Sequence, residues 1–452
     1  MIRERLNRRA EGGWLLLGAL GLLIAASAGE AGGGARAFRP PAIDPVGPFA
    51  PLVRAAGLQW DPAILRSASV LAGLLVALAA VWLAARSPRP PRAWLLGLLT
   101  AVVLALMLFP GVALQAGLRQ SSAPWFHTND STFQIELGGE LLRAGANPYG
   151  ADYRFSGMER FYSRDGTADT ALRNGQVALR HFAYFPGTPL TGAAWGLLPE
   201  PWSDYRFLAL ICTLAGAAAA LLFQGPLGWR LALGALIAAN PIAIKSAWFG
   251  QADAPALLCV LLAFALITRS RLVWAAVLLA VAILLKQFAL FAVPFLALAI
   301  WKAGDRDSRL RSALAFGGVL FVGFLPFVIM DIGALYTDTV EYGRSIYPII
   351  GYGLGPLLLK AGLISDRTGD YALFLPLALL VWLPATLVLL RAQARSPWLW
   401  VAAAGFATSL YVLFFISRVF QETYLAWPLT AIALAGLLAI DQRAREPAAA
   451  NG

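Results

Sequence analysis

Residues 67–85 read SASVLAGLLVALAAVWLAA, a run without a charged side chain. A helix needs about 20 mostly apolar residues to cross the hydrocarbon core of a bilayer. A basic turn with Arg86, Arg89 and Arg92 follows at once. Short basic loops stay on the cytoplasmic side of a membrane. The stretch therefore predicts a membrane helix whose C-terminal end lies inside the cell.

The whole chain has the composition of a membrane protein. It has 452 residues, of which 59% are hydrophobic and 13% are charged, about half the charged fraction of a soluble domain. Helices satisfy their backbone hydrogen bonds internally in lipid, and the alternating pattern of a membrane β-barrel is absent. We therefore expect an all-α polytopic membrane protein, a single integral domain over residues 1–452 with about 12 spans.

The net charge of +11 is also typical of nucleic-acid binding, but the excess Arg and Lys lie in short loops, where they set membrane orientation. We expect no nucleic-acid partner. Cys212 and Cys259 lie inside apolar segments and are interpreted as small core residues.

The basic turns fix the expected topology. A basic N-terminus precedes an apolar run at 14–28, which we interpret as a retained first helix, with a cleavable signal peptide as the alternative. A Gly- and Pro-rich outer loop at 30–66 and a third helix at 93–116 place residues 118–200 outside the cytoplasm. Residues 186–198 are apolar but short, and we expect a re-entrant helix there. Later spans are expected near 204–223, 229–247, 253–268, 272–286, 288–301, 310–330, 371–390, 398–416 and 424–440.

The loop at 118–200 is the longest polar interruption of the chain. We expect it to hold the site, together with a second outer loop at 331–370 that carries Arg344. Residues 131–143 are expected to form an amphipathic helix on the membrane or the bundle. Ser131 and Gln134 match a capping box, and Gly145 suits the C-terminal end.

Ionisable residues at the ends of membrane helices are costly, and they indicate functional sites. In the expected topology, five such residues lie on the same outer side as Asp130: Lys245, Asp253, Lys286, Arg418 and Glu422. The cations could hold the phosphate of a lipid-linked substrate. The alternative is that they snorkel to the membrane surface, with the two acids as ion-pair partners. Asp130 suits a general base or metal ligand, or alternatively a charge that stabilises the helix dipole.

The remaining polar residues of the loop also have two interpretations. His127 and His181 lack the spacing of a metal pair, so each contacts a substrate or bonds locally. The aromatic side chains Trp125, Tyr149, Tyr184 and Phe185 suit stacking on a sugar, although aromatic belts at membrane interfaces have the same composition.

Several short motifs, in their order along the chain, support a family resemblance. An acid opens the loop, and LRAGANPY (142–149) and YFP (184–186) follow; FGQAD (249–253), LLK (284–286) and RVFQETYLAWP (418–428) come later. This pattern resembles the polyprenol-phosphate-sugar-dependent membrane glycosyltransferases of the GT-C superfamily, in particular the alpha-mannosyltransferase branch (glycosyltransferase family 87 and relatives). The chain departs from that pattern in its two extra leading helices, in Tyr184-Phe-Pro186 for Tyr-Pro-Pro, and in a single leading acid.

The resemblance implies an inverting transfer of mannose or a similar hexose or pentose. The donor would be a polyprenyl-phosphate sugar and the acceptor an extracytoplasmic glycan or lipid, at the outer face of a bacterial plasma membrane. Asp130 would be the catalytic base, and a divalent cation stays open because the acid is single. Lys286, Arg418, Lys245 and Arg344 would bind the donor phosphate. Substrate-binding residues would be His127, Asn129, Tyr149, His181, Tyr184, Gln251, Asp253, Glu422 and Tyr424.

Two other classes of membrane protein compete with this interpretation. A flippase or transporter for lipid-linked sugars would place its charges near the bilayer midplane and show internal repeats, and neither is evident in the sequence. A non-catalytic assembly protein would tolerate neutral substitutions at Asp130, Lys286 and Arg418.

Overall fold

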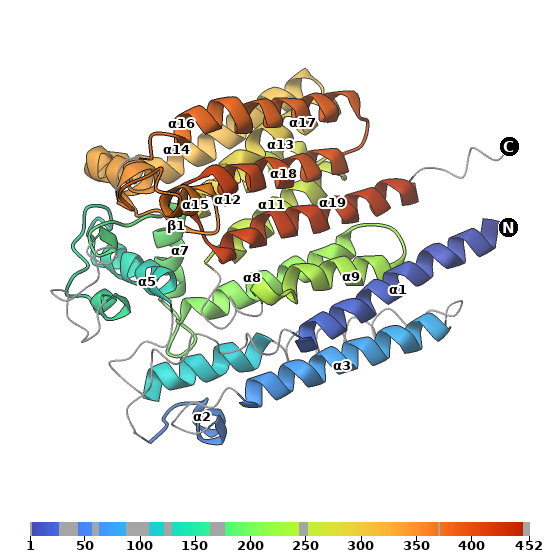
Figure 1. Cartoon of the computed structure of the whole chain (residues 1–452), viewed down its shortest axis with the longest axis horizontal. Coiled ribbons are helices and arrows are strands. Elements are labelled where there is room, and N and C mark those ends of the chain that lie inside the picture. The colour runs from blue at the N-terminus through green and yellow to red at the C-terminus, as the bar shows by residue number, and fades with distance from the viewer. Residues whose placement is uncertain are drawn as a thin grey trace. The chain divides into compact units, whose positions relative to one another are not determined.

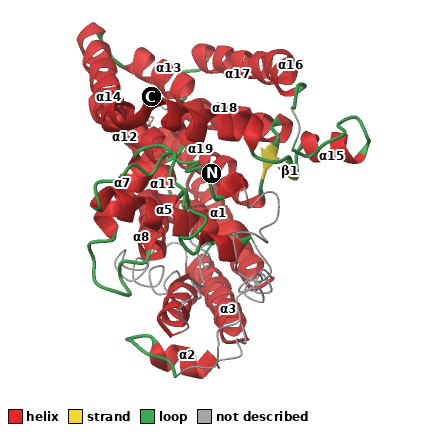
Figure 2. Ribbon diagram, turned by 90° about the vertical axis from the view of Figure 1, so that its left-hand side faces the viewer, coloured by secondary structure: helices red, strands yellow, loops and turns green. Residues whose placement is uncertain are grey.

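The computed structural model describes residues 2–26, 44–56, 63–86, 108–121, 129–162, 177–243, 252–368 and 371–445. Helices dominate these ranges (Figures 1 and 2). Within them, the one sheet is a parallel pair of two-residue strands, β1 (Ile350–Gly351) and β2 (Val419–Phe420). The chain divides into two compact units, which are described separately below.

The first unit contains Met1–Thr128, Arg206–Ala254 and Ile432–Gly452. Its helices include α1 (Ile2–Ala26), α2 (Ala50–Ala56), α3 (Ala63–Arg86), α8 (Tyr205–Ala219), η4 (Ala220–Leu222), α9 (Leu227–Ala238) and the end of α19 (Ala426–Arg445). Helices α1 and α3 cross where Gly21 faces Gly73. A Cβ atom on Gly73 would lie 2.4 Å from the Gly21 carbonyl oxygen, and one on Gly21 would lie 2.6 Å from the Gly73 oxygen. The two glycines therefore allow the close backbone approach typical of membrane helix pairs.

This crossing gives a matched pair of glycine substitutions. Gly73→Ala should lower stability by about 1–3 kcal/mol, because the new methyl group overlaps the α1 backbone. Gly317→Ala is the control, since a Cβ at Gly317 meets nothing within 4 Å, and alanine should there gain about 0.5–1 kcal/mol of helix propensity. Thermal unfolding of the purified chain in detergent measures both changes. Equal effects at the two positions would contradict the crossing.

The second unit contains Asn129–Tyr205 and Pro255–Ala431. Its helices up to residue 346 include α5 (Asp130–Arg143), η3 (Met158–Phe161), α7 (Gly187–Trp195), α11 (Ala254–Ile267), α12 (Leu272–Leu285), η5 (Gln287–Ala292), α13 (Val293–Ala303), α14 (Arg306–Tyr336) and η6 (Thr337–Ile346). After β1 come α15 (Leu354–Lys360), α16 (Phe374–Leu377), η7 (Ala378–Trp382), α17 (Leu383–Arg395), α18 (Trp400–Ile416), η8 (Glu422–Leu425) and the start of α19.

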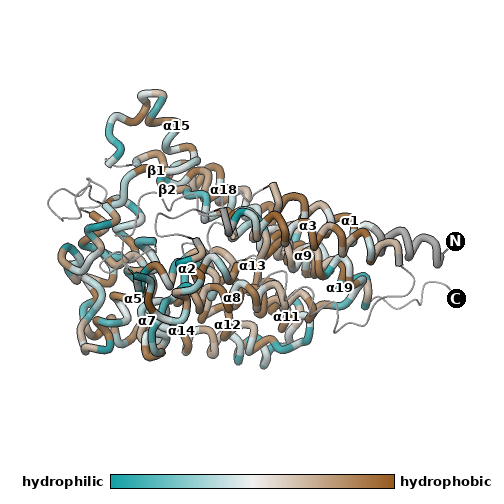
Figure 3. The backbone as a smooth tube through the Cα atoms, turned by 90° about the horizontal axis from the view of Figure 1, so that it is seen from below, coloured by the Kyte–Doolittle hydropathy of each residue, from teal (hydrophilic) through white to brown (hydrophobic). Residues whose placement is uncertain are grey.

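Within the described ranges, five helical segments are long and apolar enough to cross a membrane. They are Arg66–Ala85, Tyr205–Leu222, Arg306–Ile346, Phe374–Arg395 and Glu422–Arg445, and shorter apolar helices accompany them. Figure 3 shows hydrophobic residues along α1, α3 and α9, and a mixture of hydrophobic and hydrophilic residues along α5. The prediction of a helical chain suited to a membrane is confirmed at this level. Helix α7, with nine residues, is only about 13 Å long, too short to cross a bilayer.

Two of the predicted loops contain helical segments. Residues 30–66 contain α2 and the start of α3, because apolar residues continue among the glycines and prolines there. The first part of the predicted loop at 331–370 is also helical. The helix breaks at Asp331, whose backbone is extended (φ −167°, ψ 98°). Its carboxylate then accepts a hydrogen bond from the Ala334 backbone N–H at 2.9 Å, which starts a new helical segment that continues to Ile346.

Candidate functional site

Asp130 is the first residue of α5, and Asn129 caps this helix. The Asn129 Oδ1 atom accepts hydrogen bonds from the Thr132 backbone N–H at 2.7 Å and the Ser131 hydroxyl at 2.9 Å. The predicted capping box at Ser131 and Gln134 is therefore wrong. Asparagine is among the best N-cap residues, and it stands two positions earlier. The end of the helix is as expected, since Gly145 has a left-handed backbone (φ +76°).

Gln134 does not cap the helix; it connects α5 to the segment around His181. Its amide donates to the backbone oxygens of His181 at 2.8 Å and Ala178 at 3.4 Å. A Cβ atom on Gly139 would lie 2.4 Å from the Ala193 backbone nitrogen, so α5 also lies directly on α7. These contacts fix the start of α5, and with it Asp130, relative to residues 178–193.

The Asp130 carboxylate has a phenol partner that the sequence did not reveal. Its Oδ1 atom accepts a hydrogen bond from the Ser131 backbone N–H at 2.8 Å, and Oδ2 accepts one from the Tyr162 hydroxyl at 2.5 Å. Burial, and then the charge of Asp130, raises the pKa of Tyr162 well above its usual value. The phenol therefore stays protonated and holds the carboxylate in place. Each carboxylate oxygen has a second lone pair for an incoming hydroxyl.

Tyr347 also lies within the field of Asp130. Burial, and then this negative charge, raises the pKa of Tyr347 to about 12. In the unfolded chain this phenol ionises near pH 10. The contribution of protonated Tyr347 to the stability of the fold is therefore fully present below pH 10. It is lost as the pH rises from 10 through 12.

The free energy of unfolding should therefore decrease less at alkaline pH in Tyr347→Phe than in the unsubstituted protein. The difference is on the order of 3 kcal/mol for a two-unit difference in pKa. The melting temperature between pH 9 and 12 measures it. Tyr352→Phe, at a side chain that is 68% exposed, is the control. A Tyr347→Phe curve identical to that of the unsubstituted protein would contradict this coupling.

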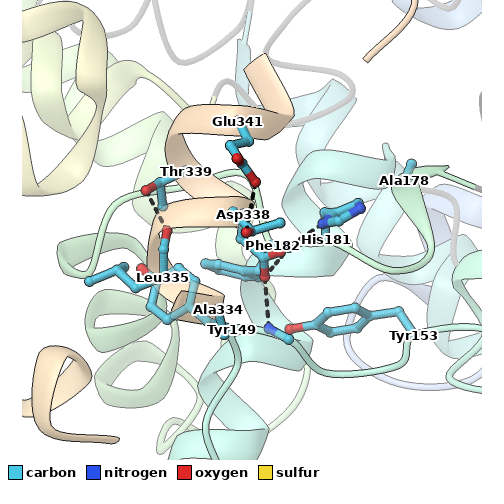
Figure 4. Close-up of polar contacts among 12 residues, drawn as sticks. Tyr149, Tyr153, Ala178, His181, Phe182, Ala334, Leu335, Asp338, Thr339 and Glu341 are labelled. Carbon is cyan, nitrogen blue, oxygen red and sulfur yellow. Dashed lines mark hydrogen bonds and ion pairs between the residues drawn. The ribbon is translucent and has the colours of Figure 1, made fainter. Parts of the chain in front are cut away.

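Asp338 is the buried centre of this region (Figure 4). Its Oδ2 atom accepts hydrogen bonds from the backbone N–H groups of Gly150 at 2.8 Å and Phe182 at 3.1 Å. Its Oδ1 atom lies 2.7 Å from His181 Nδ1, and the residue is 2% exposed. With Nδ1–H donated to Asp338, a neutral His181 presents Nε2 as an acceptor. Asp338 was missed because it falls in a segment interpreted as loop, without a motif around it.

Asp338→Ala should lower stability by about 3–5 kcal/mol, because two backbone N–H groups and His181 lose their acceptor in a buried place. Asp366→Ala, at an exposed aspartate that accepts from Thr368, should cost less than about 1 kcal/mol. Thermal melting of the two variants tests this contrast. A loss at Asp338 no greater than that at Asp366 would be inconsistent with the buried network.

Tyr149 positions Tyr184. The Tyr149 hydroxyl donates to the Tyr184 backbone oxygen at 2.8 Å, and the Tyr149 side chain is 3% exposed. Its ring meets Phe182 and Phe327 edge-on, with centroids 5.6 and 5.4 Å away. Because this ring is enclosed, the predicted stacking on a sugar is better suited to the half-buried Tyr184.

Lys286 lies beside aromatic rings, at the break between α12 and η5. This break matches the predicted boundary, since Lys286 has an extended backbone (φ −158°, ψ 125°). Its ammonium nitrogen lies 4.9 Å from the Tyr184 ring centroid and 5.2 Å from that of Phe288. The Phe288 ring in turn contacts Tyr424 at 4.7 Å and Trp427 at 5.9 Å. Lys286 is 8% exposed, so ring faces replace much of its hydration.

The YFPG stretch reaches Lys286 through a close backbone contact. A Cβ atom on Gly187 would lie 2.7 Å from the Leu284 carbonyl carbon, so only glycine fits there without a shift. The Thr188 hydroxyl donates to the Leu285 oxygen at 2.8 Å, and the Gln287 amide donates to the Ala183 oxygen at 3.2 Å. These bonds hold Tyr184 beside the α12–η5 break.

Arg418 lies directly before β2, and its backbone oxygen accepts a hydrogen bond from the Ile350 N–H at 3.1 Å. The Arg418 guanidinium donates to the Arg344 backbone oxygen at 2.9 Å, and Arg418 is 4% exposed. The β1–β2 pair needs glycine at Gly351 (φ +99°), where a Cβ atom would lie 1.8 Å from the Phe420 oxygen. The side chain of Arg344 is exposed.

A series of electrostatic and ring interactions links Asp130 with Lys286 inside the second unit. The Tyr347 ring lies within the field of Asp130 and is tilted against the Tyr342 ring, with centroids 5.3 Å apart. Tyr342 in turn lies 5.1 Å from the His181 ring. Phe182, next in sequence, lies 5.6 Å from Tyr184, which contacts Lys286. The carboxylate and the buried cation thus belong to one packed network.

The other predicted residues are placed as follows. Glu422 and Tyr424 are half-buried in η8 of the second unit, and Asn129 caps α5. Asp253 is 5% exposed and belongs to the first unit. His127, Lys245 and Gln251 lie outside the described residues. Among the residues that are described, no three His, Cys, Asp or Glu side chains gather as metal ligands would.

No protein-family model matches the chain, and no curated protein or solved structure is detectably similar to it.

Proposed function

We propose that the protein is a membrane glycosyltransferase that moves a sugar from a polyprenyl-phosphate donor to an extracytoplasmic glycan or lipid acceptor. In this proposal the chain crosses the membrane about 12 times, and the second unit holds the site at the outer surface. Mannose and similar hexoses or pentoses fit the proposal equally.

The observation that supports this proposal is the packed network between a held carboxylate and a buried cation. Asp130 is oriented by Ser131 and Tyr162, and Lys286 is enclosed by Tyr184 and Phe288. A base needs an oriented carboxylate, and a phosphate leaving group needs a fixed cation in a dry place. The half-buried rings of Tyr347 and Tyr184, between Asp130 and Lys286 in this network, offer apolar faces to a sugar.

The proposed reaction is a single displacement. The acceptor hydroxyl transfers its proton to Asp130 while its oxygen forms a bond to the anomeric carbon. The bond from that carbon to the phosphate oxygen breaks, and the electron pair leaves with the lipid phosphate. Lys286 and Arg418 stabilise the added negative charge. Attack opposite the leaving group inverts the anomeric centre.

An assay with reconstituted vesicles separates this activity from transport. The full chain is incorporated with a radiolabelled polyprenyl-phosphate sugar, and both the chemical form and the membrane side of the label are measured. Label transferred to a new acceptor supports the glycosyltransferase. Label that crosses the bilayer while still bound to its lipid phosphate would instead indicate a flippase, and label unchanged in both respects would contradict both activities.

A further inference from the structure

A second site lies away from the network around Lys286. Helices α12, α13 and α14 surround a pocket of about 400 Å³, a volume within the range of small-molecule sites. It uses Ala276 and Leu279 in the middle of α12, whereas Lys286 follows the last residue of that helix. Its wall is apolar except for Arg309 and Ser312.

The hydroxyl of Ser312 indicates that the pocket takes a ligand with a polar group. Ser312 is 2% exposed and lines the pocket. Its Oγ atom has no hydrogen-bond partner among the residues that the structure describes. Burying a hydroxyl without a partner is unfavourable, and an oxygen of a bound ligand would supply the missing acceptor.

Arg309 places a positive charge beside the pocket. Its guanidinium carbon lies 4.2 Å from the ring centroid of Trp301, and Trp301 is 62% exposed. Within the described ranges, the buried Arg309 Nε atom has no hydrogen-bond partner. The neighbouring acid Asp305 is occupied as the N-cap of α14, where it accepts from the Ser308 backbone N–H at 2.9 Å. The charge of Arg309 is therefore available to an anion.

The apolar part of the wall follows α13. Val293 and Trp301, both in the wall, are eight residues apart on α13, which corresponds to about 12 Å along a helix. The small side chains of Ala297 and Ala313 line the same wall and are exposed. Tryptophan and arginine at the end of an apolar helix are typical of the membrane interface, where anionic lipids attract basic residues.

We propose that this pocket binds an anionic glycerophospholipid, with an acyl chain along α13 and the phosphate at Arg309. An ester or phosphate oxygen accepts the hydrogen bond of the Ser312 hydroxyl. The planar guanidinium suits bidentate contact with phosphate, and its stacking on Trp301 keeps it oriented. The site is separate from the proposed donor site and does not depend on the proposed reaction.

Native mass spectrometry of the full chain tests this site with two lipids that share the same acyl chains, phosphatidylglycerol and phosphatidylcholine. Phosphatidylglycerol should be retained more strongly. Arg309→Gln should weaken its binding about fivefold, the effect of one cation near a lipid surface, and leave phosphatidylcholine unchanged. Ala297→Phe fills the pocket and should weaken both lipids.

Two matched variants serve as controls. Arg391→Gln removes an exposed cation of α17, and Leu314→Phe enlarges an exposed apolar residue that does not line the pocket; both should leave binding unchanged. If Ala297→Phe fails to fold, Ala313→Phe fills the pocket from α14. Equal affinity for the two lipids, or unchanged phosphatidylglycerol binding in Arg309→Gln or in a folded filling variant, would overturn the proposal.

Discussion

Asp130→Asn should reduce sugar transfer by roughly 10²–10⁴-fold, the usual contribution of a general base. The amide has the size of the carboxylate and can still accept from the Ser131 backbone N–H. Its NH₂ group can donate to Tyr162, whose hydroxyl then accepts. Folding and donor binding should therefore persist while proton abstraction is lost. Transfer rates with a saturating donor, and donor binding measured separately, distinguish the two effects.

Asp331→Asn is the matched control for this variant. Asp331 also begins a helical segment and accepts a backbone N–H, from Ala334 at 2.9 Å, but it is exposed and outside the network. Its transfer rate should stay unchanged. A folded Asp130→Asn variant with full activity would remove this carboxylate from the mechanism.

Lys286→Met should lower kcat/KM for transfer by roughly 10²–10³-fold, because charge stabilisation of the leaving phosphate is lost. Methionine keeps an unbranched apolar stem between Tyr184 and Phe288, so the aromatic packing should survive. Removing a buried charge in this way is often neutral or favourable for stability. The melting temperature should therefore not fall with the activity. Lys286→Arg, which retains the charge, should recover part of the rate.

Lys360→Met provides the comparison, since Lys360 is an exposed lysine at the end of α15. It should have no effect on transfer. If Lys286→Met and Lys360→Met transferred sugar equally fast, the lysine at the α12–η5 break would have no part in phosphate departure.

The helical fold could be predicted well from hydropathy, because apolar runs mark buried or lipid-facing helices directly. The break at Lys286 and the end of the span before Asp331 were both visible as polar residues within or after such runs. The helix from Asp331 to Ile346 could not be predicted in this way, because the segment is polar and only its capping contact and packing favour a helix. Gly21 and Gly73 likewise indicate a helix crossing only once the structure shows that they face each other.

The candidate site was predictable in its motifs but not in its partners. Sequence singled out Asp130, His181 and Lys286 because polar residues beside apolar runs need an explanation. Tyr162 and Asp338 lie 32 and 157 residues from their partners, Asp130 and His181, and no spacing rule joins such distances. For Tyr149, the motif predicts a ligand contact but not the hydrogen bond from its hydroxyl to the Tyr184 backbone oxygen.

The most direct measurement is an experimental structure of the full chain with a polyprenyl-phosphate sugar analogue bound. The account predicts phosphate density within about 4 Å of the Lys286 ammonium group, the distance of an ion pair. It also predicts that the anomeric carbon faces the Asp130 carboxylate. A phosphate bound elsewhere, with Asp130 and Lys286 contacting no part of the donor, would contradict the proposed transfer.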